Sequence, residues 1–143
     1  MLSVASIGHV AIRVKAIEPT LEFYVGKLGF QEMMRFDRDG KLWIVYLRIT
    51  DTQFLEVFPD GEGERAPERE ATGYNHMCLV VPDIEQCLAE LAAAGVPLIR
   101  PKVKQVDNNW QCWIEDPDGH RIELMQMAED SLQGQAIQRL KQP

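Results

Sequence analysis

The sequence is poor in cysteine, has no excess of positive charge and contains no long hydrophobic run. Its three cysteines, Cys78, Cys87 and Cys112, are odd in number and form no Cys-x-x-Cys pair. We therefore expect them to be reduced, partly buried small hydrophobic residues of a cytoplasmic protein, without a catalytic role.

The charge balance argues against two classes of partner. Twenty-two acidic residues against fifteen basic ones give a formal net charge of −7 and an isoelectric point near 4.9. Nucleic-acid recognition needs a basic patch, and an anionic membrane surface attracts positive charge, so neither partner is expected. No apolar run approaches the roughly 20 residues of a spanning helix. The start, MLSVASIGHV, lacks the basic region and long apolar core of a signal peptide.

Two parts of the chain match each other at a constant offset, which indicates an internal repeat. IGHVAIRVKAIEPTLEFYVGKLGF aligns with YNHMCLVVPDIEQCLAELAAAGV, so that His9 falls on His76 and Leu21 on Leu88, 67 residues later in both cases. Each half is predicted to form a strand, a helix and three further strands. The expected strands are 7–14, 30–36, 41–49 and 53–58 in the first half, and 76–81, 97–103, 109–115 and 120–127 in the second.

The two predicted helices have recognisable ends. Asp83 is expected to cap the second helix, with Gln86 as its capping-box partner, and Gly95 to end it. Pro19 is tolerated in the first turn of the first helix, which is expected to end near Gly29. The βαβββ unit thus occurs twice. We expect an α+β fold in which each curved sheet packs one face on its helix and opens the other toward a cleft.

We expect a single domain over residues 1–143. Its modules are predicted at 5–60 and 74–128, with a linker at 61–73 and a short C-terminal helix at 129–141. The stretch between the modules, PDGEGERAPEREATG, is rich in glycine, proline and charge, which favours a solvated linker. A mobile lid over a substrate is the alternative interpretation.

Two histidines and two glutamates occupy equivalent places in the repeat. His9 and His76 open the first strand of each half, and Glu56 and Glu123 lie 47 residues after them, among apolar residues of the last strand. A carboxylate embedded in an apolar strand is costly unless it is paired or bound to a metal. Two imidazoles and two carboxylates suit Ni²⁺, Co²⁺, Zn²⁺, Mn²⁺ or Fe²⁺. Inherited core histidines with two rim glutamates are the alternative, and His120, after the DPDG turn, is interpreted as a turn residue.

At this point the chain resembles the vicinal-oxygen-chelate superfamily of glyoxalases, bleomycin-resistance proteins and dioxygenases. The motifs that carry the resemblance extend over residues 5 to 128 and are HVAIRV, YVGKLGF, FLEVF, NHMCLVV and EDPDGHRIEL. The four-ligand set and the short chain are most similar to glyoxalase I (lactoylglutathione lyase) of the compact bacterial type. The resemblance implies one divalent metal per site, with Ni²⁺ or Co²⁺ favoured and Zn²⁺ an alternative.

The same resemblance implies a reaction and an assembly. The hemithioacetal of a thiol and a 2-oxoaldehyde such as methylglyoxal would be isomerised to a 2-hydroxyacyl thioester, through an enediolate stabilised by the metal. Glu123 would be the proton-transferring base and Glu56 its partner on the opposite face. A homodimer is implied, in which His9 and Glu56 of one subunit face His76 and Glu123 of another.

The residues that would bind glutathione match less completely. Arg13 matches the arginine that holds the γ-glutamyl carboxylate, but Asp60 stands where the family commonly has an asparagine. Lys104 lies where a lysine meets the glycyl carboxylate, although its spacing to Glu123 is one residue longer than usual. QVDNNW replaces the usual glycine-rich run, and its Trp110 would narrow the pocket or simply pack.

Three other functions remain open on the same scaffold. An acyl-thioester epimerase usually has glutamine where this chain has Glu56. A ring-cleaving dioxygenase uses two histidines and one carboxylate, and a fourth ligand would occupy the position that dioxygen needs. A non-catalytic protein that sequesters small molecules often lacks the full ligand set, which this chain has.

Overall fold

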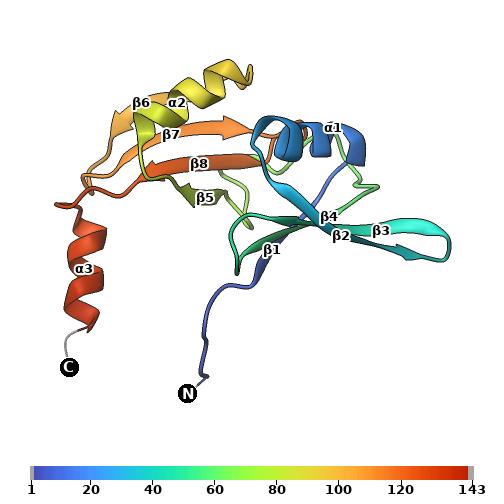
Figure 1. Ribbon diagram of the computed structural model, residues 1–143, viewed down its shortest axis with the longest axis horizontal. Helices are drawn as coiled ribbons and strands as arrows, with labels where there is room; N and C mark the ends of the chain where they lie inside the picture. The colour runs from blue at the N-terminus through green and yellow to red at the C-terminus, as the bar shows by residue number, and fades with distance from the viewer. Residues whose placement is uncertain (1, 142–143) are drawn as a thin grey trace. The chain divides into compact units, whose positions relative to one another are not determined.

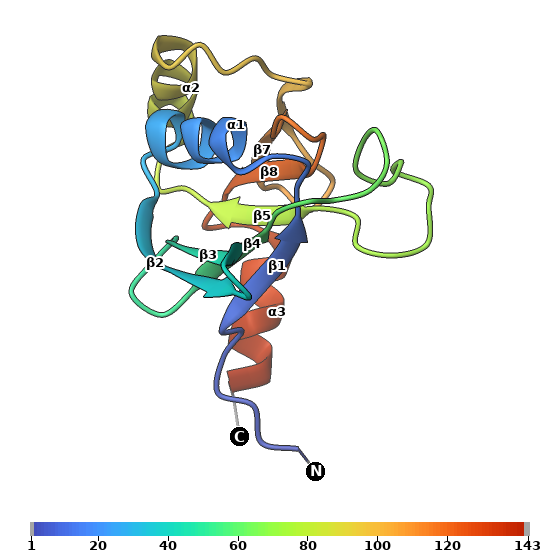
Figure 2. The same ribbon diagram turned by 90° about the vertical axis from the view of Figure 1, so that its right-hand side faces the viewer.

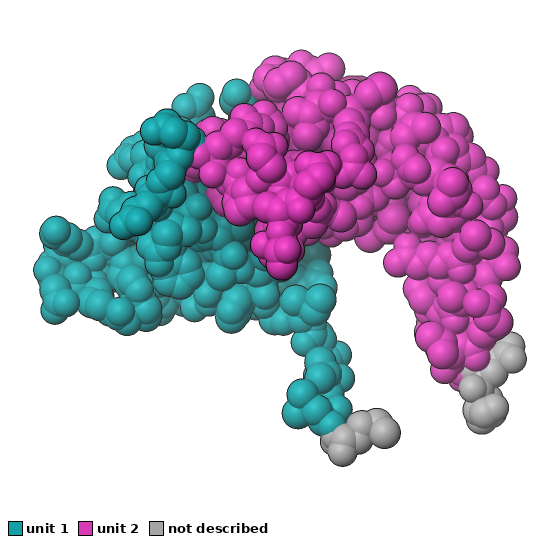
Figure 3. All heavy atoms as spheres, turned by 180° about the vertical axis from the view of Figure 1, so that it is seen from behind, with its two compact units in different colours: residues 1–64 teal, residues 65–143 magenta. Residues whose placement is uncertain are grey.

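A computed structural model describes residues 2–141 of the chain. It divides into two compact units, Met1–Glu64 and Arg65–Pro143, which are distinguished by colour in Figure 3. Each unit contains one four-stranded mixed sheet, and each sheet has helical structure next to it in sequence. The predicted α+β fold with two βαβββ modules and a short C-terminal helix is confirmed.

The first unit has the sheet order β1-β4-β3-β2, in which β1 pairs in parallel with β4 and the other pairs are antiparallel. Figures 1 and 2 show this arrangement, with β1 alongside β4. Its elements are β1 (His9–Arg13), α1 (Ile17–Leu21), η1 (Glu22–Lys27), β2 (Gln31–Arg38), β3 (Lys41–Arg48) and β4 (Phe54–Phe58).

The second unit repeats this topology. Its sheet order is β5-β8-β7-β6, with β5 parallel to β8, and α2 lies over one face of the sheet (Figure 1). The helix α3 follows the last strand. The elements are β5 (Met77–Val80), α2 (Ile84–Ala93), β6 (Arg100–Lys104), β7 (Trp110–Glu115), β8 (Arg121–Gln126) and α3 (Leu132–Lys141).

The offset of 67 residues holds through the two cores. Leu55 in β4 and Ile122 in β8 are both fully buried, as are Val45 in β3 and Cys112 in β7. Alternate residues of a strand point to opposite faces. These four residues therefore lie on one face of each sheet, and Glu56 and Glu123 lie on the other face.

The helix of the first unit is less regular than predicted. A single helix was expected up to Gly29, but α1 passes after Leu21 into the π-helix η1. The wider turn is visible in the hydrogen bond from Leu28 N to Phe23 O, which spans five residues. Phe23 and Tyr24 are both buried in this segment, with their rings edge to face at 5.1 Å.

The helices of the second unit begin at capping residues. Asp83 accepts hydrogen bonds from Glu85 N and Gln86 N, and Gly95 follows the helix with φ 65°, as predicted. The side chain of Gln86 does not complete the capping box, because it donates to Glu90 instead. The terminal helix starts at Leu132 rather than at 129, since the buried Ser131 accepts from Gly134 N and acts as its cap.

All three cysteines are free. Cys87 and Cys112 are buried, whereas Cys78 is exposed and departs from the partly buried position that was expected. Among residues 2–141, no helix combines the length and the apolar character needed to cross a membrane.

Candidate metal site

The first unit places Glu56 and His9 together. Glu56 is the central residue of β4 and only 7% exposed, with Ala11 of β1 and Tyr46 of β3 as its neighbours in register. His9 is the first residue of β1, and its Nε2 lies 3.4 Å from Glu56 Oε2. Because His9 and Ala11 are two residues apart in a strand, they share the face on which Glu56 lies.

The second unit contains the equivalent pair. Glu123 is 8% exposed, and its neighbours in register are Cys78 of β5 and Trp113 of β7. His76 Nε2 lies 3.1 Å from Glu123 Oε2. His76 was expected to open a strand at 76–81, but β5 begins one residue later, at Met77. The histidine therefore sits at the end of the preceding loop.

The position of His76 depends on two further contacts. Its Nδ1 lies 2.9 Å from Asn75 Oδ1, so that Nε2 is the nitrogen that faces Glu123. The imidazole also packs against Trp113, with ring centroids 4.7 Å apart and an interplanar angle of 65°. These contacts restrict the ring on two sides.

The surroundings of the two glutamates change the pKa values of their neighbours. A hydrogen bond to Glu56, with burial and the charge of the same carboxylate, raises the pKa of Tyr46. Cys78 is exposed as a whole residue, yet desolvation of its sulfur raises the pKa of the thiol to about 12. The charge of Glu123 and a hydrogen bond to it contribute to this shift. Cys78 thus stays protonated near neutral pH.

The donor set fits a divalent cation. Within residues 2–141, the basic side chain next to Glu56 is His9 and that next to Glu123 is His76, so neither buried carboxylate has a lysine or arginine to neutralise it. Imidazole and carboxylate together suit Ni²⁺, Co²⁺ and Zn²⁺. In the same residues, no group of three or more His, Cys, Asp or Glu side chains is arranged to hold a metal. Each unit by itself thus provides one imidazole and one carboxylate.

Arg13 and Asp60 lie near each other at one end of the first sheet. Arg13 is the last residue of β1, on the face of His9, and its Nη1 donates to Pro59 O at 2.9 Å. Its guanidinium also lies 5.2 Å from the centre of the Phe58 ring. Asp60 follows directly after Pro59 and is exposed, with φ 58°. Both residues are exposed.

Lys104 is not part of the His76–Glu123 cluster. It ends β6, the edge strand farthest from β5 in the second sheet, and its Nζ lies 3.9 Å from Asp130 Oδ2. Trp110 lies opposite it in register and packs under Lys102, whose Nζ is 4.8 Å from the ring centroid. In its own unit, therefore, Trp110 is a packing residue at the start of the interior strand β7.

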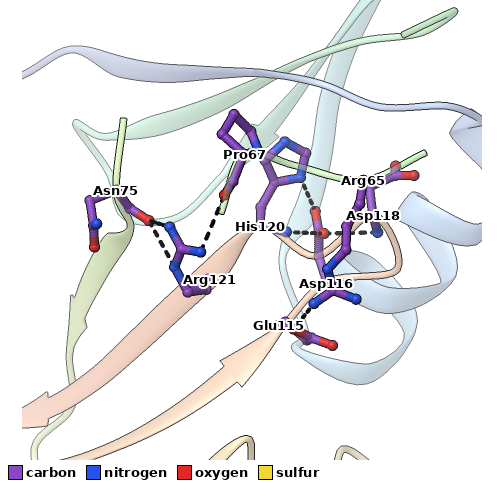
Figure 4. Close-up of polar contacts among 8 residues, drawn as sticks. All are labelled: Arg65, Pro67, Asn75, Glu115, Asp116, Asp118, His120 and Arg121. Carbon is purple, nitrogen blue, oxygen red and sulfur yellow. Dashed lines mark hydrogen bonds and ion pairs between the residues drawn. The ribbon is translucent and has the colours of Figure 1, made fainter. Parts of the chain in front are cut away.

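His120 belongs to a buried turn. Its Nδ1 lies 2.9 Å from Asp116 Oδ2, and Asp116 Oδ1 accepts from the backbone N–H groups of Asp118 and His120 (Figure 4). Asp116 is buried, so these bonds satisfy a carboxylate that has no access to water. The interpretation of His120 as a turn residue agrees with these contacts.

Part of the segment that was expected to be a solvated linker contacts this turn. This part begins at residue 65, where the second unit begins. We call residues 65–75 the connecting segment. Arg65 forms an ion pair with Glu115, and Ala66 N donates to Asp118 O at 2.8 Å. Arg121 donates to the carbonyl oxygens of Pro67 and Asn75, as Figure 4 shows.

Four residues near the glutamates were missed by the sequence reasoning. Tyr46 and Trp113 occupy equivalent positions 67 residues apart, so the repeat could have identified them. Cys78 could have been found by strand alternation, since it lies two residues after His76. Asn75 had no signal in the repeat, because Gly8 stands at the matching position.

Two βαβββ units, each with a histidine next to a buried glutamate in the last strand of its sheet, define a vicinal-oxygen-chelate type of protein. The chain belongs to the Glyoxalase/Bleomycin resistance protein/Dioxygenase superfamily, whose family model matches residues 6–124. Members of this superfamily bind small-molecule substrates, typically with a divalent metal, and dimers are common among them.

Individual relatives name more than one activity. The chain is 26% identical to a lactoylglutathione lyase of Pseudomonas putida, over 83% of each chain. It is 28% identical to a catechol-2,3-dioxygenase of Bacillus subtilis, over 82% of this chain and 40% of that protein. The crystal structure of a glyoxalase family protein from Enterococcus faecalis has a TM-score of 0.75 and 31% identity, covering 85% of this chain and 97% of the other.

Proposed function

We propose that the protein is a metal-dependent lyase of glyoxalase I type, which isomerises the hemithioacetal of a 2-oxoaldehyde and a thiol to a 2-hydroxyacyl thioester. The observation that carries the proposal is the pair of matching His–Glu contacts, 3.4 Å and 3.1 Å, around buried carboxylates. The lactoylglutathione lyases of Pseudomonas putida and Neisseria meningitidis are similar to it along most of their length.

In this proposal His9, Glu56, His76 and Glu123 together hold one divalent ion. The ion would supply Lewis acidity toward two oxygens on adjacent substrate carbons. The two pairs would be brought together either within one chain or between two copies in a homodimer. Ni²⁺ or Co²⁺ is favoured and Zn²⁺ is the alternative, since the donor set suits all three.

Glu123 is proposed to move the proton. One carboxylate oxygen would accept it from the carbon beside the substrate carbonyl, and the same oxygen would return it to the neighbouring carbon. The sulfhydryl of Cys78 is a weak donor, so it does not compete strongly for this carboxylate. Trp113 lies opposite Glu123 in register and packs against His76.

Glu56 and its neighbours are proposed to orient the substrate from the other side. The hydroxyl of Tyr46 holds the Glu56 carboxylate by a hydrogen bond. Arg13 is proposed to bind a carboxylate of the thiol, beside Asp60, which would favour an amine on the same ligand. Glutathione carries both groups. Lys104 is proposed as the contact for its second carboxylate, across subunits or at the edge of the second sheet.

The test is metal analysis of the purified protein after reconstitution with Ni²⁺, Co²⁺ or Zn²⁺, beside the variants His76→Ala and His9→Ala. The same samples are assayed for isomerisation of the methylglyoxal–glutathione hemithioacetal. We expect stoichiometric metal and activity in the wild type and a loss of both in each variant. His120→Asn is the matched control, because it removes the third imidazole and should keep both metal and activity.

Two results would contradict the proposal in different ways. Metal bound without isomerase activity would retain the site but remove the lyase function, and a catechol would then be the first other substrate to assay, given the dioxygenase relative. If the wild type binds no metal under any of these conditions, the four-ligand site itself is wrong.

A further inference from the structure

Asn75 has a fixed amide orientation. Its Nδ2 lies 2.7 Å from the backbone carbonyl oxygen of Arg69, which can only accept a hydrogen bond. The amide nitrogen must therefore face Arg69, and the amide oxygen faces His76 Nδ1 at 2.9 Å. No flip of the amide satisfies both contacts.

This orientation determines the tautomer of His76. An amide oxygen only accepts, so Nδ1 of the imidazole must carry the proton in that contact. A metal binds the neutral imidazole, which has one N–H, so a proton on Nδ1 leaves the lone pair of Nε2 for the metal. Nε2 is the atom that faces Glu123 Oε2 at 3.1 Å, on the side of the proposed ligand set.

The backbone of Asn75 is held by the strand that carries Glu123. Arg121 Nε and Nη2 both donate to Asn75 O, at 3.1 Å and 2.7 Å (Figure 4). Arg121 begins β8 and Glu123 is two residues further on, so the two side chains come from the same face of the same strand. One short stretch of β8 therefore positions both members of the His76–Glu123 pair.

We propose that Asn75 is a positioning residue that keeps the proton on Nδ1 of His76 and so presents Nε2 as a metal ligand, with Arg121 holding Asn75 in place. The inference depends on the proposed function only in assuming that His76 binds a metal. Without a metal, Glu123 Oε2 is a second acceptor beside Nε2, so the tautomer that the Asn75 contact favours is measured with this carboxylate removed.

The first experiment measures the tautomer without metal. Glu123→Ala removes the second acceptor beside His76 and a proposed ligand, and long-range ¹⁵N–¹H NMR at a pH above the imidazole titration then locates the proton. We expect Nδ1–H in this background and a shift to Nε2–H when Asn75→Ala is added. Asn75→Asp should restore Nδ1–H, because it keeps an acceptor at that place. Glu123→Leu is the second background if Glu123→Ala does not fold.

The second experiment measures affinity for Co²⁺ or Zn²⁺ by competition with a chelator. Removal of a hydrogen-bond partner behind a metal-bound histidine typically weakens binding by about 10- to 100-fold. We expect this loss in Asn75→Ala and none in Gly8→Ala, the matched position before His9, where an added Cβ meets no atom within 4 Å.

The outcomes separate the inference from the proposed function. Nε2–H in the Glu123→Ala protein overturns the inference, whatever the metal results. Equal metal affinity in Asn75→Ala and the wild type also overturns it, because the contact then positions no ligand. The expected tautomers in a protein that binds no metal would support the role of Asn75 in orienting His76 and contradict the metal-dependent lyase.

Discussion

The two His–Glu pairs occupy equivalent backbone positions, but their histidines are held very differently. The side chain of His9 is 52% exposed and follows a glycine, whereas that of His76 is 31% exposed and contacts both Asn75 and Trp113. An internal repeat thus preserves the strand register more closely than the contacts around each side chain. Of the two halves, the second has the more preorganised donor.

The glutamates differ in the opposite sense. Besides its histidine, Glu56 has the hydroxyl of Tyr46 as a hydrogen-bond donor, whereas Glu123 has the thiol of Cys78, a weaker donor. A carboxylate held by a strong donor is suited to a fixed ligand, and a less constrained one is suited to moving a proton. The difference supports the proposed division between Glu56 as partner and Glu123 as base.

The assignment of Glu123 as base and Glu56 as partner is tested most directly by changing each glutamate to glutamine. Glu123→Gln should lower kcat/KM by about 10² to 10⁴, the usual contribution of a general base. Glu56→Gln should lower it less and mainly reduce metal affinity. Isomerase kinetics at saturating metal measure both variants side by side. Equal losses, or a larger loss in Glu56→Gln, would reverse the assignment.

A second difference between the units lies in the core, where Cys112 stands at the place of Val45. Burial, and then the neighbouring Cys87, raise the pKa of Cys112 from 9.0 to about 11. The unfolded thiol therefore ionises first, so its contribution to stability is complete below pH 9 and is lost as the pH rises toward 11. At 1.36 kcal/mol per pKa unit, the loss amounts to at most roughly 2 to 3 kcal/mol.

Cys112→Val copies the first unit and removes this titration. Denaturant unfolding at intervals between pH 8 and 11 should show a shallower fall in the free energy of unfolding for the variant than for the wild type. Parallel curves would mean that the buried thiol does not titrate differently in the folded state.

The smallest expected effect on stability comes from the residues that precede the helices α1 and α2. Asp83 caps α2 through two backbone N–H groups, whereas Ala16 precedes α1 without a side-chain cap. Asp83→Ala should lower the free energy of unfolding by about 1 kcal/mol. Ala16→Asp should raise it by about 0.5 kcal/mol or less, because Pro19 has no N–H to donate and only Glu18 N remains. Thermal unfolding of the two variants checks both signs.

The repeat made most of the fold predictable. Strand alternation places Glu56 and Glu123 on the face opposite the buried Leu55 and Ile122. The same offset of 67 residues relates equivalent positions in both sheets, which the local preferences of single residues would not produce. Asp83 and Gly95 marked the ends of α2, because capping depends on the few residues that make the bonds.

The rest depended on contacts between distant residues. No amino-acid composition distinguishes a π-helix such as η1 from an α-helix in the sequence. The wider turn buries Phe23 and Tyr24 together. Asn75 reads as an ordinary loop residue until Arg121, 46 residues away, holds its carbonyl. Whether the two pairs meet in one site is still a prediction, as are the homodimer and the cytoplasmic location.

The hydrogen bonds of Arg121 also affect which residues of the connecting segment can be substituted in evolution. Arg121 binds the carbonyl oxygens of Pro67 and Asn75, and Asn75 in turn binds the carbonyl oxygen of Arg69. Backbone carbonyls are present whatever the residue type. The path of this loop is therefore specified by the side chains of Arg121 and Asn75. Between Arg69 and Asn75, the residues other than Gly73, whose φ of 142° favours glycine, can be substituted or redesigned for a new ligand without moving His76.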